Sequence, residues 1–561
     1  MPYANLAVMH QEVAARLGPK PALRFRRDGL YYDLSWTDYR RQCDAAAAGL
    51  LDLGLKIGDR VALFSENRLE WLLADVAILS AGLVNVPLHA ALVANQAAYQ
   101  IQNSQARGII VDGPAHFDRI RSILATLPLV EFIVTFDPIH PHAPIPVLSW
   151  EGLKRRGHEH RQRRPAHVHE RMQTIGRDQL ATIIYTSGTT GQPKGVMLTH
   201  GNLLANAEAM CATCGLDQDD QLLSWLPYSH IYARTCDHYT TMFSGCTVAL
   251  AENLDSLIRN LAEVQPTWLT AVPRFYEKVW SLVAPLALPE RTDRLHAIFG
   301  PRIKWLTSGG APLNPQIAEG FHEAGLLLLQ GYGLTEASPV ISFNSRQKYR
   351  LASVGQVLPG SEVCIAGDGE ILTRGPNVMQ GYWQNDEATR EAIDAEGWLH
   401  TGDIGYLDED GFLFITDRKK DIIVTAGGKN IAPAELERIL ISDQHIEHAV
   451  IYGDARPFVA ALIVPQPQLL EVKAKELGCS IEKEGELITT PALLAFFMKR
   501  VEKLMHAVSQ PERVKKILLL GRPLSIDQDE LTPKLSVRRK AIIQKFAAAF
   551  DGLYQSTDRE T

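Results

Sequence analysis

Ten residues between an apolar run and a helical pattern have the composition of a polyphosphate-binding loop. Residues 186–195 read TSGTTGQPKG and contain three glycines, four hydroxyl side chains and Lys194. Glycine lets the backbone approach a ligand closely, and amide, hydroxyl and ammonium groups all donate to phosphate oxygens. Lys194 follows Pro193 and no Gly-Lys-Ser/Thr is present, so this is not a Walker A motif. A flexible surface turn is the alternative, and a loop of this composition after a buried strand argues against it.

Later segments add the carboxylates, hydroxyls and cations that a nucleotide site needs. Singly, each one has a simpler explanation. The Asp in a Thr-Gly-Asp turn usually caps a turn or helix, a Glu after Thr often belongs to a capping box, and a Lys near other basic residues often starts a solvated helix. Their combination in one chain favours a site. The segments are 308–313 (SGGAPL), 331–336 (GYGLTE), 401–403 (TGD), 417–421 (DRKKD) and 531–535 (LTPKL).

The whole composition is that of a globular protein of more than one domain. The chain has 561 residues, of which 46% are hydrophobic and 22% charged, and this length exceeds what one compact core usually holds. A formal net charge of −7 gives no support for nucleic-acid binding. Seven cysteines, an odd number, fit a reducing compartment. Cys211 and Cys214 form a CxxC, but no second ligand pair accompanies them, so we expect both on a helix over 202–215.

The sequence shows no signal peptide and no membrane-spanning segment. The most apolar stretch, 71–94, is interrupted by Asp75, Asn85 and Pro87, so we expect a buried helix followed by a buried strand. The expected location is cytoplasmic, and a peripheral contact at the inner face of the membrane stays open. The sequence does not indicate an oligomeric state.

Short apolar runs alternate with helical patterns over most of the chain. Continuous apolar runs suit parallel strands that are covered on both faces. Helical patterns span 69–82 and 255–264, and the Arg- and His-rich segment 155–170 is expected to be a solvated loop between two sheet units. The fold class is therefore α/β, with a large N-terminal domain of layered, mostly parallel sheets and helices. The predicted strands are 61–64, 108–111, 132–135, 181–185, 247–251, 268–271 and 326–330.

The pattern of apolar, charged and glycine residues changes near Asp417. A strand pair over 448–452 and 459–464, followed by helices, indicates a smaller α+β domain. The predicted domains are residues 1–419 and 420–561.

The five segments together with TSGTTGQPKG resemble the motifs of the adenylate-forming superfamily, which includes acyl-CoA synthetases, peptide-synthetase adenylation domains and beetle luciferases. The resemblance extends from about Trp36 to Lys540. It implies an enzyme that uses ATP and Mg²⁺ to convert a carboxylic acid to an acyl-adenylate, and in the synthetases then passes the acyl group to coenzyme A.

The resemblance also implies roles for individual residues in adenylation. His230 would orient the substrate carboxylate, although a buried histidine with a satisfied hydrogen bond is an equal alternative. Thr335 would hold a phosphate oxygen and Glu336 would bind the metal. Lys534 would reach the α-phosphate. The implied nucleotide contacts are Thr186, Ser187, Gly188, Thr189, Thr190, Gly191 and Lys194 for the phosphates, Gly309, Gly310, Ala311, Gly331, Tyr332 and Gly333 for adenine, and Asp403 and Arg418 for ribose.

For the second half-reaction, the resemblance implies that the smaller domain is mobile and rotates about Lys420. The loop that contains Gly427, Gly428 and Lys429 would then face the pantetheine arm of coenzyme A.

Residues 224–230, 266–278 and 417–433 resemble the long-chain branch of the acyl-CoA synthetases, so the expected substrate is a long-chain fatty acid. The segment 279–307 is shorter than in the larger members, which leaves the chain length open. The alternatives are a fatty acyl-AMP ligase that loads a carrier protein and a non-catalytic nucleotide-binding homologue. The second would be expected to lose Lys194, Glu336 or Lys534, and all three are present.

Overall fold

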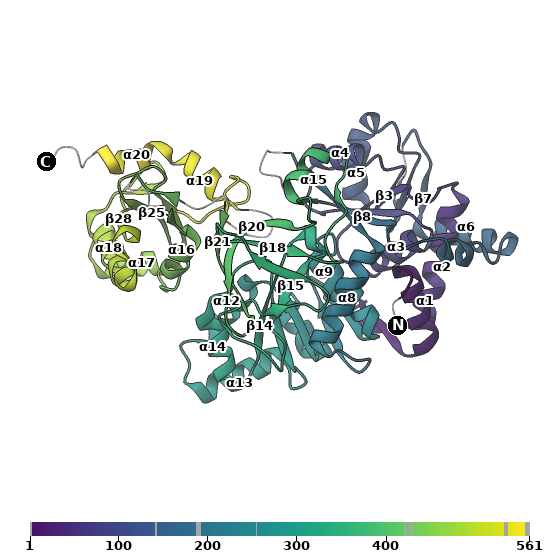
Figure 1. The fold of residues 1–561 in the computed structure, drawn as a ribbon, viewed down its shortest axis with the longest axis horizontal. Coiled ribbons are helices and arrows are strands. Elements are labelled where there is room, and N and C mark those ends of the chain that lie inside the picture. The colour runs from purple at the N-terminus through teal and green to yellow at the C-terminus, as the bar shows by residue number, and fades with distance from the viewer. Residues whose placement is uncertain are drawn as a thin grey trace. The chain divides into compact units, whose positions relative to one another are not determined.

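The structure is a computed structural model that describes residues 3–140, 143–186, 192–253, 255–419, 423–426, 430–531 and 537–555 (Figure 1). The chain divides into two compact units. The first consists of Met1–Cys364, Leu372–Thr401 and Leu407–Phe414, and the second of Ile365–Ile371, Gly402–Tyr406 and Ile415–Thr561. The chain passes between the units several times before residue 415. The boundary expected between residues 419 and 420 stays a prediction.

Two large, mostly parallel sheets form the first unit. The nine-stranded sheet is parallel from β1 to β14, apart from the antiparallel β1–β2 edge, and its other edge, β14–β15–β16, is antiparallel. Its order is β16 (Gln356–Val357), β15 (Val340–Phe343), β14 (Leu328–Gly333), β13 (Trp305–Ser308), β12 (Trp268–Ala271), β10 (Gln221–Ser224), β11 (Thr247–Leu250), β1 (Pro21–Arg27) and β2 (Leu30–Ser35).

The second large sheet has eight strands, and only β8, β9 and β19 make antiparallel pairs. Its central strands are buried on both faces, which is why they read as continuous apolar runs. All seven strands expected from such runs are confirmed, within a few residues at their ends. The order is β19 (Gly381–Tyr382), β9 (Lys194–Thr199), β8 (Leu180–Thr186), β4 (Val84–Leu88), β3 (Arg60–Phe64), β5 (Gly108–Val111), β6 (Phe132–Thr135) and β7 (Val147–Ser149).

Helices connect these strands. The buried helix and strand expected over 71–94 are confirmed as α3 and β4, and Cys211 and Cys214 lie on α8 as expected. None of the helices in the described part of the chain has the length and apolar character that crossing a membrane requires. The helices of the first unit are α1 (Leu6–Leu17), α2 (Trp36–Asp52), α3 (Leu69–Ser80), α4 (Ala94–Asn103), α5 (Pro114–Ile123), α6 (Trp150–Arg163), α7 (His167–Gln173), α8 (His200–Cys214), α9 (Ile231–Ala233), the π-helical turn η2 (Arg234–Tyr239), α10 (Thr240–Ser244), α11 (Leu257–Val264), α12 (Pro273–Val283), α13 (Leu288–Phe299), α14 (Pro315–Glu323) and α15 (Asp386–Ala392).

The prediction of a solvated loop over 155–170 is wrong, because this segment lies within α6 and α7. The buried residues of α6 are Trp150, Leu153, Gly157 and His160, which recur at helical spacing, while the arginines occupy the other face. One of these four residues is a glycine and one a histidine, so the apolar periodicity is weak in the sequence. Ser149 caps the helix by accepting a hydrogen bond from the Gly152 N–H at 3.0 Å.

The second unit has its own core around a three-stranded sheet in the order β24 (Ile446–Tyr452), β25 (Val459–Pro465) and β28 (Val514–Leu519). The strand pair expected over 448–452 and 459–464 is confirmed as β24 and β25. Among the described residues of this unit, the α-helices are α16 (Pro433–Ile441), α17 (Pro467–Glu476), α18 (Pro491–Leu504), α19 (Arg539–Lys545) and α20 (Ala547–Gln555). A separate four-stranded sheet has the order β17 (Glu362–Ile365), β18 (Glu370–Arg374), β20 (Leu399–Leu407) and β21 (Leu413–Arg418), and two small hairpins are β22 (Ile423–Val424) with β23 (Asn430–Ile431) and β26 (Lys483–Glu484) with β27 (Leu487–Ile488).

The packing of α6 on α2 yields a testable prediction. A Cβ atom at Gly157 would lie 1.8 Å from the Ala45 carbonyl oxygen, so Gly157→Ala must push the two helices apart. We expect a loss of about 1–3 kcal/mol in the free energy of unfolding, despite a gain of roughly 1 kcal/mol in helix propensity. Urea unfolding checks this. Gly552→Ala in α20, where a Cβ would meet nothing within 4 Å, is the control and should be neutral or slightly stabilising. Wild-type stability of Gly157→Ala would contradict the packing argument.

Candidate active site

The ends of β8 and β9 flank the candidate phosphate loop. Thr186, the last residue of β8, pairs with Lys194, the first residue of β9, in an antiparallel register. The strand pairing therefore brings two of the predicted phosphate contacts to the base of one loop. The predicted contacts Ser187, Gly188, Thr189, Thr190 and Gly191 lie outside the described residues.

Tyr382 joins two predicted site residues from distant parts of the chain. The Lys194 ammonium lies 5.0 Å from the centroid of the Tyr382 ring, and the Tyr382 hydroxyl donates a hydrogen bond to Glu336 Oε1 at 2.9 Å. Tyr382 is on β19, which pairs with β9 beside Lys194. Burial and, second, the Glu336 carboxylate raise the pKa of Tyr382 above its ordinary value, so the phenol remains a donor. Tyr382 was not predicted from the sequence, because its contacts are tertiary and no motif surrounds position 382.

A tight turn presents Thr335 and Glu336. They begin the short helix η3 (Thr335–Ala337), which follows β14. The Leu334 N–H donates to the Pro339 carbonyl at 3.0 Å, and a Cβ at Gly333 would lie 1.8 Å from that same oxygen, so only glycine fits there. The Met379 N–H donates to the Glu336 carbonyl at 2.8 Å and fixes the turn from another side.

Gly331 and Tyr332 occupy the preceding positions of β14 and are partly buried.

The segment that contains His230 lies against the predicted adenine-side loop. His230 caps α9, and its Nδ1 accepts a hydrogen bond from the Tyr232 N–H at 3.2 Å. Neutral His230 therefore carries its proton on Nε2. A Cβ at Gly309 would lie 2.9 Å from the Tyr232 ring, so this loop and α9 are in close contact. Gly310, with φ of +79°, and Ala311 follow and are exposed.

The predicted ribose contacts, Asp403 and Arg418, form an ion pair in the second unit. Arg418 Nε lies 2.8 Å from Asp403 Oδ1, and the Asp403 side chain is buried while that of Arg418 is exposed. Next to Arg418, Lys419 forms ion pairs with Asp368 at 2.6 Å and Glu370 at 2.7 Å. Lys419 was not expected to have a separate role. Lys420, Gly427, Gly428, Lys429 and Lys534 lie outside the described residues.

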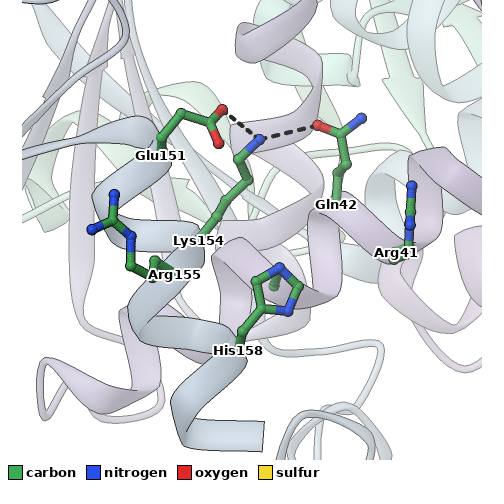
Figure 2. A pocket seen from close by; sticks show the side chains of 7 residues that line it. Arg41, Gln42, Glu151, Lys154, Arg155 and His158 are labelled. Carbon is green, nitrogen blue, oxygen red and sulfur yellow. Dashed lines mark hydrogen bonds and ion pairs between the residues drawn. The ribbon is translucent and has the colours of Figure 1, made fainter.

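A surface hollow of about 390 Å³ lies between α2 and α6 (Figure 2). Figure 2 shows Lys154 between Glu151, with which it forms an ion pair at 2.6 Å, and Gln42, to which it donates at 3.3 Å. None of the predicted site residues lines this hollow, so it is not part of the candidate active site.

Two family models match the chain. The AMP-binding enzyme model matches residues 10–383, and the AMP-binding enzyme C-terminal domain model matches residues 420–558. The chain is 35% identical to the long-chain-fatty-acid–CoA ligase FadD15 of Mycobacterium bovis over 94% of this chain and 93% of that protein. It is 29% identical to the long-chain-fatty-acid–CoA ligase ACSBG1 of Bos taurus over 98% of this chain and 85% of that protein.

The same architecture occurs in a solved structure. The crystal structure of ATP-bound MatB from Rhodopseudomonas palustris matches with a TM-score of 0.76 at 24% identity, and the match covers 97% of this chain and 99% of that one. This likeness agrees with the α/β fold class that the sequence predicts. Because the first family model matches most of the chain, the chain belongs to the AMP-binding enzyme family.

Proposed function

We propose that this chain is an AMP-forming fatty acid–CoA ligase that acts on long-chain fatty acids. The acid and ATP give acyl-AMP and pyrophosphate, and acyl-AMP and coenzyme A then give acyl-CoA and AMP. The substrate class is supported by relatives named long-chain-fatty-acid–CoA ligases, one of them 35% identical over 94% of this chain. Family membership supports ATP and coenzyme A as substrates. A peripheral contact with the inner face of a membrane, where such acids partition, is part of the proposal.

The single observation that carries the chemistry is the Lys194–Tyr382–Glu336 arrangement beside the phosphate loop. In adenylation a carboxylate oxygen attacks the α-phosphorus of ATP, and the bond to the pyrophosphate oxygen breaks. Both reactants are anions, so the site must supply positive charge and alignment. Lys194 would supply a cation at the base of the loop, and His230 would orient the carboxylate of the acid. Thr335 would hold a phosphate oxygen.

Glu336 has the properties of a magnesium ligand. A carboxylate offers about four lone-pair positions, and the bond from Tyr382 uses one of them while it fixes the orientation of the group. Mg²⁺ takes only one or two protein carboxylates and completes its shell with phosphate oxygens and water. When bound, Mg²⁺ would neutralise charge on the phosphates.

The remaining residues divide between the nucleotide and the second half-reaction. Gly309, Gly310, Ala311 and Tyr332 would line the adenine pocket, and Asp403, held by Arg418, would accept the ribose hydroxyls. Rotation about Lys420 would replace Lys534 by the loop of Gly427, Gly428 and Lys429. The thiolate of coenzyme A then attacks the acyl carbon and AMP leaves, so no cysteine nucleophile is needed.

The first test of this function is pyrophosphate release from ATP with acids from acetate to stearate and with aryl acids, each with and without coenzyme A. We expect release that depends on a long-chain acid and is faster with coenzyme A. Release that is indifferent to coenzyme A would point to a carrier protein as the acyl acceptor. The absence of release with every acid would contradict the proposal.

Lys534→Ala tests whether Lys534 acts in adenylation and not in thioester formation. One lost charge contact at the transition state should slow adenylation by about 10²–10³-fold, while thioester formation from supplied acyl-AMP should stay near the wild-type rate. Single-turnover rates of each half-reaction provide the measurement. Arg538→Ala, which removes a neighbouring cation, is the matched control. Equal losses in both half-reactions would remove Lys534 from this role.

Tyr382→Phe separates the two contacts of Tyr382. The ring under Lys194 remains, but the hydroxyl that orients Glu336 is lost, so the Mg²⁺ concentration for half-maximal pyrophosphate release should rise by about 3- to 10-fold, as one net hydrogen bond implies. Tyr382→Leu, which removes both contacts, should also raise the KM for ATP. An unchanged Mg²⁺ requirement in Tyr382→Phe would show that the hydroxyl does not act through Glu336.

A further inference from the structure

The continuous helix over residues 231–244 contacts several elements of the first unit that carry or adjoin candidate-site segments. It is formed by α9, η2 and α10, and each residue of its π-helical turn is buried. Its first turn lies against the adenine-side loop through Tyr232 and Gly309. Its start is capped by His230. π-helical turns occur frequently at functional sites.

Arg234 connects this helix to the strand that carries the phosphate loop. Arg234 Nη1 donates to Thr182 Oγ1 at 2.7 Å, and Thr182 lies on β8, which ends at Thr186. The guanidinium also forms an ion pair with Asp75 of α3. Both side chains are fully buried, with 0% of each exposed, so the helix is fixed to the eight-stranded sheet.

Asp237 connects the same helix to the nine-stranded sheet. Ser224, the last residue of β10, donates its hydroxyl to Asp237 Oδ2 at 2.8 Å, and the segment 224–230 that leads to His230 begins there. Burial raises the pKa of Asp237 to about 7. The helix therefore joins the two sheets whose ends present the candidate site.

Thr235 connects the helix to the turn that presents Thr335 and Glu336. Its hydroxyl donates to the Ser338 carbonyl at 2.8 Å, and both residues are fully buried. Ser338 ends the turn that presents Thr335 and Glu336. On another side, the Asn377 amide donates to the Ala337 carbonyl at 3.1 Å. Thr235 thus fixes this turn to the helix over 231–244, which Arg234 bonds to β8.

We infer that the helix over 231–244 is the positioning element of the adenylation site, and that Thr235 is a positioning residue that acts through the Thr335–Glu336 turn. The inference rests on the proposed function for its catalytic meaning. Its consequence for nucleotide binding does not depend on which acid is used.

Thr235→Val tests this, since it keeps the shape of the side chain and removes the hydroxyl. We expect affinity for ATP with Mg²⁺, measured by isothermal titration calorimetry, to fall by about tenfold. The kcat/KM for pyrophosphate release should fall by tenfold to a hundredfold, as a small misplacement of reacting groups implies, with the KM for ATP changed more than the KM for the acid. Thr235→Ser restores the hydroxyl and should bring both quantities to within about threefold of wild type.

Thr241→Val is the matched control. Thr241 is buried on the same helix, and its hydroxyl donates to the Asp237 carbonyl at 2.5 Å and to the His238 carbonyl at 3.0 Å, both within the helix itself. This variant should lose stability without loss of ATP affinity. If Thr235→Val does not fold, Thr235→Ala takes its place, and thermal unfolding shows that the variants compared are folded.

The outcomes separate this inference from the proposed function. Weaker binding of ATP with Mg²⁺ in Thr235→Val, rescued by serine and absent in Thr241→Val, supports the inference. ATP affinity of Thr235→Val equal to that of Thr241→Val overturns it. If the binding pattern holds but the wild type releases no pyrophosphate with any acid, the proposed function fails and the positioning role stands.

Discussion

The buried ion pair between Arg234 and Asp75 is the interaction on which the arrangement of the first unit depends. Neither side chain is exposed to solvent. Burial alone would raise the pKa of Asp75, but Arg234 and then His238 lower it below its ordinary range, so the carboxylate stays charged. Asn85 donates to Asp75 Oδ1 at 2.7 Å and Tyr239 donates to Oδ2 at 2.8 Å. Loss of one partner from such a pair costs about 3–5 kcal/mol. The helix over 231–244 is therefore held to α3 and, through Asn85, to β4.

The chemistry of adenylation requires that charged groups be positioned accurately. The reaction joins two anions, so small errors in the position of a cation or a metal ligand matter more than they would for neutral reactants. Lys194 and Glu336 carry opposite charges on two sides of one tyrosine. Tyr382 contacts both of them, and in the proposed mechanism the cation and the carboxylate would act on a polyphosphate and its metal.

The sequence predicted the strands well, because a buried parallel strand is a continuous apolar run and this signal is local. The constraint on Gly333 is also local, since a Cβ there would meet the Pro339 carbonyl oxygen, whereas Gly309 is constrained by Tyr232, far away in the sequence. The failures have a different physical origin. The helices α6 and α7 were missed because the buried face of α6 includes Gly157 and His160, so their apolar period is weak. Tyr382 was missed because its partners, Glu336 and Lys194, are distant in sequence. The roles of Lys420 and Lys534 remain predictions.

The π-helical turn explains how one short helix contacts several segments at once. In a regular α-helix, residues i and i+3 lie on the same face. Arg234 and Asp237 have this spacing, yet Arg234 bonds to β8 in the eight-stranded sheet and Asp237 to Ser224 in the nine-stranded sheet. Because a π-helix closes its hydrogen bonds at i→i+5, it has more residues per turn than an α-helix, and residues i and i+3 lie farther apart around its axis. The π-helical turn therefore lets Arg234 and Asp237 reach different sheets.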